Sequence, residues 1–563
     1  MRKRAVILNT AIAFGFVIVV FRLVEIMLLN HERYVKRAET QQKIKEDVRV
    51  RRGIIFDRQG RELAVNLEVD SIYCDPMRVN EPEKSARALS AVTGKPMKVL
   101  LNKFSSEGRF IWIERKVEPK ISSRINEMRI KGLYLIPDAK RFYPHGSLAS
   151  HVLGFVDIDN RGLEGVEKQY DTTLRGIGRK ILFERDASGR TLSRGVEMES
   201  KGNNLILTLD EGLQYMVEEE LDKAIKEWRA SAASAIMMDP SSGAILALVN
   251  RPSFNPHTLS DSNISARRNR AITDCYEPGS TFKIIIGTAA LEEKTVALTT
   301  LFDCSKGYAE VGKRKIRDAH RHGVLTFVEV IQKSSNVGSV MIGMKLGKEK
   351  VYSYARRYGF GEKTGIDLPG EVSGWIRPPE KWSGISIGAI SIGQEVAVSP
   401  LQVLRAYSAI ANGGFLVKPH LVSEILSPDG STVWSFKPER KRVISDHTAK
   451  TFKEILKKVT GEGGTAKSAA VEGNYVAGKT GTAQVIDPLT KRYSREKFVS
   501  SFVGFVPADN PRMAMIVVIY EPKGQIYGGV VAAPVFKRIS TNALSYLDVP
   551  RDDAQENILV VAR

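Results

Sequence analysis

The stretch YEPGSTFKIIIGTAALEE, residues 276–293, predicts an apolar helix that begins directly after an interruption of the preceding secondary structure. Pro278 and Gly279 interrupt the preceding segment, and the largely apolar residues after them predict a helix enclosed in a core. Ser280 then falls in the first turn, with Lys283 one turn later on the same face. A lysine amine can take a serine proton once burial or a like charge lowers its pKa. The pair therefore predicts a nucleophilic serine.

Short motifs of this kind also occur by chance, and the chain holds second copies of two of them. A second S-x-x-K, Ser494 to Lys497, lies in the charged segment KRYSREK and is expected in a solvated loop. Lys-Thr-Gly occurs first at 363–365, where the following Ile-Asp-Leu-Pro-Gly predicts a surface loop. The copy at 479–481 stands between NYVAG and AQV, which predicts a strand whose backbone can pair with a bound peptide. Gly481 would let a substrate approach closely.

A third motif lies between these two, in IQKSSNVGSV, where Ser334 and Asn336 form S-x-N. Alone, this pattern is more often a cap or a turn than a site. In the order S-x-x-K, S-x-N and K-T-G, the set is much rarer, and it accompanies serine acyl transfer in β-lactamases and penicillin-binding proteins.

The chain resembles the class B, monofunctional penicillin-binding proteins over nearly its whole length. EPGSTFK, KSSNVG and GKTGTAQ look like their active-site motifs. RGIIFDRQG, RFYP at 141–144 and GLEGVEKQYD at 162–171 are typical of their non-catalytic pedestal. SIGQEVAVSPLQ and IYGGVVAAPVFKRI, residues 391–402 and 526–539, are most similar to the division-specific peptidoglycan D,D-transpeptidases, the penicillin-binding protein 3 or FtsI type. Elongation-specific and sporulation-specific relatives remain open.

The resemblance implies an α/β serine acyl-transferase head of the β-lactamase-like kind, in which helices flank an antiparallel sheet and a helical subdomain is added. A mixed α+β pedestal and one transmembrane helix complete the expected architecture. At 563 residues the chain exceeds one ordinary domain. We expect a cytoplasmic tail, a transmembrane helix, a dimerisation-like pedestal, a transpeptidase domain and a C-terminal tail, at residues 1–4, 5–29, 30–200, 201–548 and 549–563.

Hydrophobic periodicity predicts several elements of this architecture. A helix is expected from about Glu211, and SAASAIMMDPSSGAILALVN predicts two apolar strands joined at 239–243. FVSSFVGFVPA and PRMAMIVVIYEP repeat the strand, turn, strand pattern around 509–511. We expect the first and last of these strands to pair, and a hairpin turn at 57–60.

The resemblance also implies a role for each motif residue. Ser280 would attack the carbonyl between the two terminal D-alanines of a peptidoglycan stem peptide, Lys283 would accept its proton, and Ser334 would relay a proton to the leaving amine. Asn336 would hold the substrate amide and order Lys283. Lys479 would help to keep Lys283 neutral and would bind the terminal carboxylate together with the strand residues Thr480, Gly481 and Thr482.

The same serine chemistry has other possible outcomes. Water in place of an acceptor amine would make a carboxypeptidase or a β-lactamase, but the E-x-x-L-N stretch of class A β-lactamases does not occur in the sequence. A β-lactam receptor that signals, or a catalytically silent division scaffold, are the alternatives of a different class. The resemblance implies no cofactor. His320 and His322 form H-x-H, but too few further ligands at metal-site spacing accompany them, so no metal is expected.

The N-terminus predicts an association with a membrane. After three basic residues the run 5–21 is uncharged, and the apolar segment continues to residue 29, long enough to span a bilayer as an uncleaved anchor. The net charge is +20, and the first 60 residues hold 13 Lys and Arg against 6 Asp and Glu, which beside such a segment favours anionic lipid over nucleic acid. Basic residues on both flanks leave the orientation undecided.

The resemblance places the protein in the inner (cytoplasmic) membrane, with its catalytic region on the extracytoplasmic side. It implies stem peptides as substrates, β-lactams as covalent inhibitors, and other division proteins as partners. Since the residues before 200 leave no room for a glycosyltransferase domain, a glycan-polymerising partner of the FtsW type is also implied. Cys74, Cys275 and Cys304 are expected as three buried thiols, although a bridge between the last two is an alternative.

Overall fold

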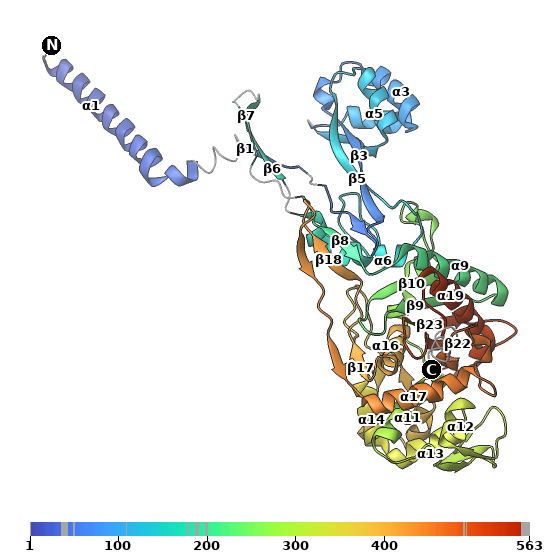
Figure 1. The fold of residues 1–563 in the computed structure, drawn as a ribbon. Helices are drawn as coiled ribbons and strands as arrows, with labels where there is room; N and C mark the ends of the chain where they lie inside the picture. The colour runs from blue at the N-terminus through green and yellow to red at the C-terminus, as the bar shows by residue number, and fades with distance from the viewer. Residues whose placement is uncertain are drawn as a thin grey trace. The chain divides into compact units, whose positions relative to one another are not determined.

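The computed structural model describes residues 2–34, 43–48, 51–108, 110–176, 179–185, 191–196, 201–487, 490 and 492–552 (Figure 1). The chain divides into two compact units. Unit 1 consists of Met1–Arg52, Glu68–Ala139 and Arg175–Gly202. Unit 2 consists of Gly53–Leu67, Lys140–Leu174 and Asn203–Arg563.

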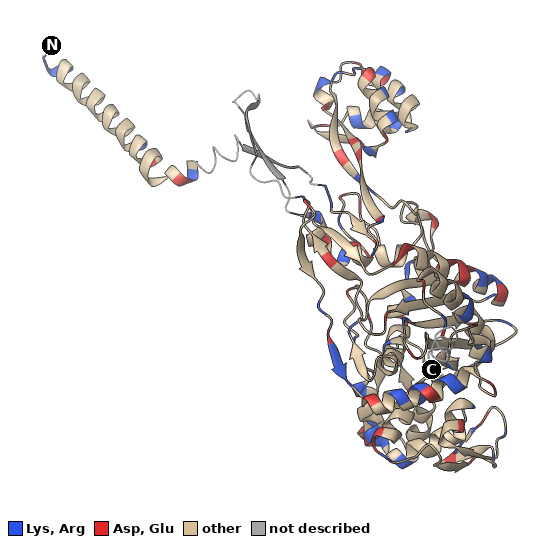
Figure 2. Ribbon diagram, viewed as in Figure 1, with Lys and Arg blue, Asp and Glu red and all other residues tan. Residues whose placement is uncertain are grey.

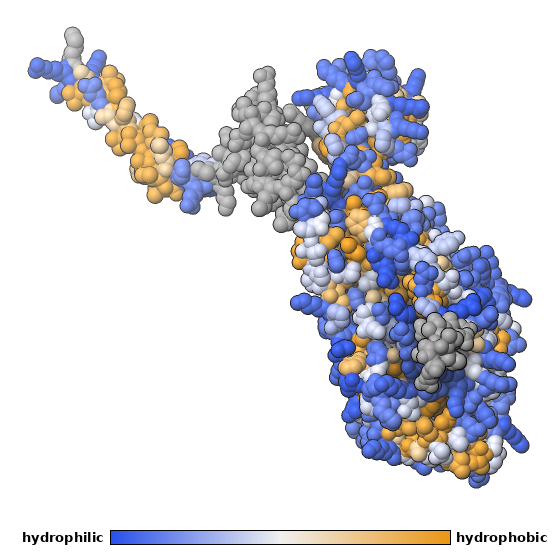
Figure 3. Space-filling model, in the orientation of Figure 1, coloured by the Kyte–Doolittle hydropathy of each residue, from blue (hydrophilic) through white to orange (hydrophobic). Residues whose placement is uncertain are grey.

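Unit 1 begins with an apolar helix. Helix α1 (Arg2–Val24) continues into the π-helical turn Glu25–Leu29. Within these 28 residues an 18-residue window has a mean hydropathy of 2.5, and none of it is buried. Figure 2 shows this helix almost free of charge beyond its first turn, and Figure 3 shows its hydrophobic surface. Its length and composition are consistent with a single-pass membrane anchor.

The rest of unit 1 contains two small sheets. Strand β4 (Ile111–Val117) pairs antiparallel with the end of β3 (Glu62–Cys74), β3 also pairs with β5 (Leu133–Phe142), and three helices accompany them: α3 (Pro82–Thr93), α4 (Met97–Phe104) and α5 (Pro119–Glu127). Ile72, Cys74 and Ile113 pack with helix residues such as Leu89 and Leu100 in one core. The second sheet has the strand order β1-β6-β7, with β1 at Lys43–Val48, β6 at Arg179–Arg185 and β7 at Thr191–Val196.

Unit 2 is built on a five-stranded antiparallel sheet of order β10-β9-β23-β22-β21. Its strands, in chain order, are β9 (Ala232–Met238), β10 (Ile245–Arg251), β21 (Ala477–Ile486), β22 (Tyr493–Val506) and β23 (Met513–Tyr520). Strands β9, β10 and β23 are buried over almost their whole length, which explains their continuous apolar sequence. The predicted pairing of the first and last strands is confirmed by the β9–β23 ladder.

Helices cover both faces of this sheet (Figure 1). Helices α9 (Glu211–Trp228) and α19 (Ala533–Tyr546) contact each other and the sheet, and Phe536 of α19 packs edge-on against Phe502 of β22. Helix α16 (Pro400–Ala411) packs against β22 and β23 on the opposite face, and α17 (Asp446–Thr460) lies against β21. The predicted helix start at Glu211 is confirmed.

A helical subdomain lies in the chain between β10 and β21. It comprises α11 (Lys283–Glu292), α12 (Phe327–Gln332), α13 (Asn336–Leu346) and α14 (Lys348–Arg357). Unit 2 also contains the shorter elements α10 (Arg270–Thr273), β11 (Leu301–Asp303), β12 (Tyr308–Val311), β13 (Arg314–Arg317), β14 (Val324–Thr326), β15 (Trp375–Ile376), α15 (Ser386–Ser391), β16 (Val396–Ala397), β17 (Phe415–Val417), β20 (Arg440–Arg442) and α18 (Gly528–Val531).

A second sheet of unit 2 runs in the order β19-β18-β8-β2-β3, and only the first residues of β3 belong to this unit. Its other strands are β2 (Ile55–Phe56), β8 (Asn204–Leu207), β18 (Val422–Leu426) and β19 (Thr432–Ser435). Strands β2 and β3 pair antiparallel, which confirms the predicted hairpin turn at 57–60. The short helices α6 (Ser150–Leu153), α7 (Gly165–Gln169) and α8 (Asp171–Arg175) lie in the chain between β5 and β6.

The motifs assigned to the pedestal meet inside unit 2. Arg141, from RFYP, donates from Nε to Glu167 Oε1 of GLEGVEKQYD at 2.6 Å and from Nη1 to the carbonyl of Gly53 at 2.8 Å. The Arg141 and Glu167 side chains are 1% and 0% exposed. Removing two charges from water is costly, and a buried ion pair recovers that cost only when its geometry is good and further hydrogen bonds are made.

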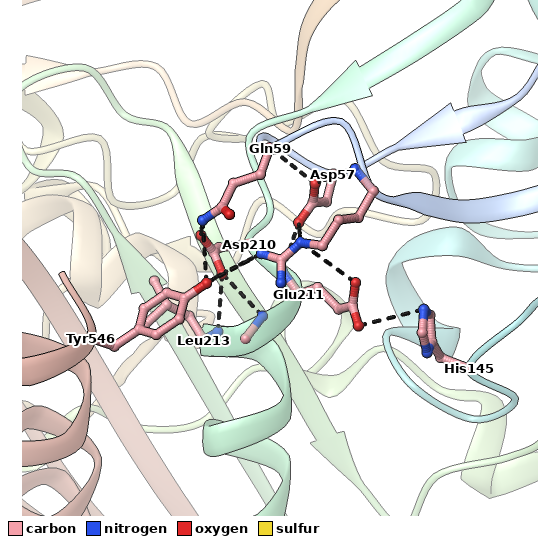
Figure 4. A network of polar contacts seen from close by, with 9 residues as sticks. Asp57, Gln59, His145, Asp210, Glu211, Leu213 and Tyr546 are labelled. Carbon is pink, nitrogen blue, oxygen red and sulfur yellow. Dashed lines mark hydrogen bonds and ion pairs between the residues drawn. The ribbon is translucent and has the colours of Figure 1, made fainter.

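A second polar network connects the β2–β3 turn to helices α9 and α19 (Figure 4). Asp210 caps α9 by accepting from the main-chain N–H groups of Gly212 and Leu213. The same carboxylate accepts from the hydroxyl of Tyr546, the last residue of α19, at 3.0 Å, and from Arg61 at 3.3 Å. These contacts hold the two ends of unit 2's sequence together.

Two expectations are wrong. Ser494 to Lys497 is not a loop but the start of β22, where its charged residues 495–497 remain exposed. All three cysteines are free, which excludes the bridge, and Cys275 is exposed rather than buried.

Candidate active site

The Ser280 segment forms a turn of 3₁₀ helix, Gly279–Phe282, immediately before α11. Ser280 lies in this turn, and Lys283 is the first residue of the α-helix. The sequence predicts Ser280 in the first turn of the helix, and the structure places it in the 3₁₀ turn directly before the α-helix. The Gly279 N–H donates to the carbonyl of Gly393 at 3.1 Å, and the hydroxyl of Tyr407 donates to the carbonyl of Thr281 at 3.0 Å. These bonds fix the main chain on both sides of Ser280.

Lys283 is buried and its amine is surrounded by acceptors. Nζ donates to the carbonyl of Ser334 at 2.6 Å, to Ser334 Oγ at 3.2 Å and to Asn336 Oδ1 at 2.9 Å. Burial lowers the pKa of Lys283 to about 7, although the negative charge of Asp318 opposes that shift. A lysine with a pKa in this range can act as a base at neutral pH.

Lys479 approaches the same hydroxyl from the sheet. It lies on β21, is fully buried, and donates from Nζ to Ser334 Oγ at 2.8 Å. Burial and then the positive charge of Lys283 hold its pKa well below the ordinary value. The structure thus brings Lys283, Ser334, Asn336 and Lys479 together from three separate elements.

Asp318 belongs to this cluster and was not predicted from the sequence. Its carboxylate accepts from Ser335 Oγ at 2.9 Å and from the main-chain N–H groups of Asn336 and Val337 at the start of α13. The Asn336 side-chain amide also donates to the carbonyl of Arg317 at 3.0 Å. No short motif could reveal Asp318, because its contacts lie 17 to 19 residues further along the chain.

Strand β21 packs directly on the Ser280 turn, and Gly481 permits this approach. A Cβ on Gly481 would lie 2.4 Å from Ser501 Oγ, 3.0 Å from Thr281 Cγ2 and 3.1 Å from the carbonyl oxygen of Pro278. Gly481 was expected to make room for substrate, and in this structure its missing side chain makes room for the turn.

The two threonines of this strand have partners on other loops. Thr482 Oγ1 accepts from the N–H of Gly528 at 3.1 Å, and Thr480 Oγ1 lies 3.3 Å from Thr465 Oγ1. Thr482 is partly exposed and Thr480 is buried.

The remaining motif copies are separated from this cluster. Lys363 is exposed in a loop, while the hydroxyl and N–H of its neighbour Thr364 both donate to Glu371. Ser280 itself is partly exposed, and within the described residues its Oγ makes no hydrogen bond, with Lys283 or any other group. Such contacts often tighten only when a substrate is bound.

Comparison with known proteins adds independent evidence. The penicillin-binding protein transpeptidase domain matches residues 233–541, and the penicillin-binding protein dimerisation domain matches residues 47–207.

Similar curated proteins cover nearly the whole chain. Stage V sporulation protein D of Bacillus subtilis is 36% identical over 99% of this chain and 88% of its own length. Peptidoglycan D,D-transpeptidase FtsI of Escherichia coli is 32% identical over 94% of this chain and 90% of its own length.

Solved structures show the same fold. Penicillin-binding protein 3 from Mycobacterium tuberculosis, complexed with aztreonam, is 28% identical with a TM-score of 0.70, covering 90% of this chain and 98% of that one. A peptidoglycan synthetase from Bifidobacterium adolescentis is 25% identical with a TM-score of 0.75, covering 91% and 98%.

Proposed function

The chain belongs to the penicillin-binding protein transpeptidase family, and from that premise we propose that it is a class B peptidoglycan D,D-transpeptidase that uses Ser280 as its nucleophile. The observation that carries the proposal is the convergence of Lys283, Ser334 and Lys479 beside the Ser280 turn, with both amines at lowered pKa.

In the acylation step, Lys283 takes the proton of Ser280, and Oγ attacks the carbonyl carbon between the two terminal D-alanines. The main-chain N–H groups of Ser280 and Thr482 receive the oxyanion, where the loss of one such donor typically costs ~100- to 1,000-fold in rate. The carbon–nitrogen bond breaks and D-alanine leaves with a proton delivered through Ser334. Lys479, Thr480 and Thr482 bind the terminal carboxylate, and Asn336 holds the substrate amide.

In the second step an amine of a neighbouring strand attacks the ester carbonyl of the acyl-enzyme. The new amide bond is the crosslink, and Ser280 recovers its proton as the carbon–oxygen bond breaks. Asp318 supports both steps by holding Asn336 and Ser335 at the start of α13.

We place this reaction in septal wall synthesis, because FtsI-named relatives match over most of the chain. The sporulation relative from Bacillus subtilis supports a second candidate, a sporulation-specific transpeptidase. We further propose that α1 anchors the protein with residues after 30 outside the cytoplasm, and that an FtsW-type glycosyltransferase supplies the strands. Depletion that produces filamentous cells supports division, whereas normal growth with defective spores supports sporulation.

A fluorescent penicillin tests the acyl-enzyme directly. The folded protein is incubated with it beside Ser280→Ala, Lys479→Ala and Lys363→Ala, and covalent label is measured on a denaturing gel. We expect label to disappear with Ser280→Ala, to weaken strongly with Lys479→Ala and to persist with Lys363→Ala, which alters the exposed copy of Lys-Thr-Gly. An unlabelled wild-type protein contradicts the proposal and favours a scaffold.

A crosslinking assay separates the transpeptidase from a β-lactam receptor. Purified protein is given glycan strands with intact pentapeptides, and dimeric stem peptides and free D-alanine are quantified. Equal amounts of dimeric stem peptides and free D-alanine indicate transfer to an amine. D-alanine without dimers indicates hydrolysis, and acylation by penicillin without either product indicates a receptor.

A further inference from the structure

Unit 2 contains a cavity of about 590 Å³ at one end of the five-stranded sheet. Its floor is a row of residues that face one another across the strands: Ala483 on β21, Val499 on β22, Tyr520 on β23 and Ala232 on β9. This volume lies within the range of small-molecule binding sites. None of the predicted site residues lines the cavity.

The opposite wall is the segment 274–277, which leads into the Ser280 turn, together with Trp375 and Ala397. Tyr276 exchanges two main-chain hydrogen bonds with Val398, at 3.0 Å each, so this wall is held in place. An occupant would therefore contact both the segment before Ser280 and the continuation of the strand that carries Lys479.

The carboxylates that line the cavity differ in whether a positively charged side chain neutralises them. Asp274 forms ion pairs with Arg268 and Arg270, and Glu521 lies 3.5 Å from Lys497. Glu277 accepts from the N–H of Glu395 at 2.9 Å and from the hydroxyl of Tyr493 at 3.0 Å, both at Oε1. Across the described residues, Glu277 has no cationic partner within 4.0 Å.

Glu277 is thus a partly buried carboxylate with neutral hydrogen-bond donors and no cation at ion-pair distance, and the positive charge of Arg314 acts on it only from further away. Burial raises its pKa, as expected for a charge that is poorly solvated. Apolar and aromatic side chains line the cavity beside its charged groups, and two of them, Trp375 and Ile486, are 48% and 45% exposed. Such a wall suits a ligand with an apolar body and one positive charge, because the charge can pair with Glu277 and contact the indole face.

We propose that this cavity is a second binding site, which takes an aliphatic primary ammonium with its charge against Glu277. Two sources carry this group: a free diamine, and the side-chain amine of a stem peptide. The second source rests on the proposed function, whereas the site itself does not.

Cys275 provides a readout that is independent of Ser280. It lines the cavity and is exposed, whereas Cys74 and Cys304 are buried. Methyl methanethiosulfonate modifies such a thiol: the thiolate sulfur forms a disulfide with the methylthio group, and methanesulfinate leaves. The rate is followed by mass spectrometry on the full-length protein in detergent, with Cys275→Ser as the background.

Protection of this thiol tests the proposal. Cadaverine, or a stem tripeptide with a free side-chain amine, is expected to slow modification several-fold, whereas their N-acetylated forms are not. Protection by cadaverine supports the free-amine source, and protection by the tripeptide alone supports the acceptor strand. Absence of protection by either amine overturns the site, even if Ser280 still reacts with penicillin.

Variants and charged reagents complete the test. Glu277→Gln retains an acceptor for Glu395 and Tyr493 but removes the charge, and it should abolish protection; Glu521→Gln, on the same cavity, should retain it. Equal protection in wild type and Glu277→Gln overturns the role of Glu277. If Glu277→Gln fails to fold, the wild-type protein is tested with two charged reagents. 2-Aminoethyl methanethiosulfonate must modify Cys275 faster than the 2-sulfonatoethyl reagent, after each rate is divided by the rate with a free thiol.

Discussion

Ser334 Oγ lies between two buried lysines, 2.8 Å from Lys479 Nζ and 3.2 Å from Lys283 Nζ. A hydroxyl oxygen has two lone pairs and one proton. If both amines donate to it, the Ser334 proton must point to a third group, and in the proposed reaction that group is the leaving amine. Burial lowers the pKa of both lysines, and the positive charge of Lys283 lowers that of Lys479 further.

The first prediction concerns the pH dependence of acylation. Lys283 must be neutral to accept a proton, and its pKa is lowered to about 7. The second-order rate of penicillin acylation should therefore rise with pH, reach half its plateau near pH 7, and fall about tenfold per unit below that. Stopped-flow measurements with a fluorescent penicillin, with circular dichroism at each pH to exclude unfolding, provide the test. A rate independent of pH between about 5 and about 9 would mean that Lys283 is not the base.

The second prediction concerns Asp318, whose negative charge raises the pKa of Lys283 against the effect of burial. Asp318→Asn removes that charge but retains an acceptor for the N–H groups of Asn336 and Val337. The acidic limb of the acylation profile should then move to lower pH. Asp303→Asn is the matched control, because Asp303 is exposed and hydrogen bonds to Ser305. A shift to higher pH, or an equal shift in both variants, contradicts the electrostatic role.

The third prediction concerns the contact between β21 and the Ser280 turn. Gly481→Ala adds a methyl group 2.4 Å from Ser501 Oγ and 3.1 Å from the carbonyl of Pro278. Main-chain atoms cannot give way without moving the turn, and overpacking of this kind typically costs about 1 to 3 kcal/mol. The acylation rate constant of the folded protein should fall strongly, whereas most of the protein should remain folded. Gly384→Ala, at a glycine with open space around it and, as at Gly481, no positive φ, controls for the added methyl group without contact to the site.

Much of the site could be predicted because its motifs are local. The buried helix after Ser280, the strand at 477–486 and the cap before Asn336 each follow from residues within a few positions. Asp318 and the ion pair of Arg141 with Glu167 could not be derived in this way, because their contacts join segments far apart in sequence. The charged stretch 494–497 predicts a loop because its residues are polar. It is a strand because β22 extends along β21, with Tyr493 opposite Ile486, before its buried part begins.

The last prediction concerns the buried pair of Arg141 and Glu167, which joins two of the pedestal motifs within unit 2. Glu167→Ala leaves the guanidinium of Arg141 buried without its counter-ion, which should cost about 3 to 5 kcal/mol. Replacement of both residues, as Arg141→Met with Glu167→Leu, should cost much less, because neither charge then remains.

The stability of unit 2 can be measured as the loss of penicillin labelling after heating, because Ser280 lies in this unit. Glu310→Gln breaks the exposed pair with Lys315 and should change stability by less than about 1 kcal/mol. If Glu167→Ala is as stable as Glu310→Gln, the buried pair contributes little. If the double replacement is as unstable as Glu167→Ala, then packing and the Gly53 contact, rather than an uncompensated charge, account for the loss.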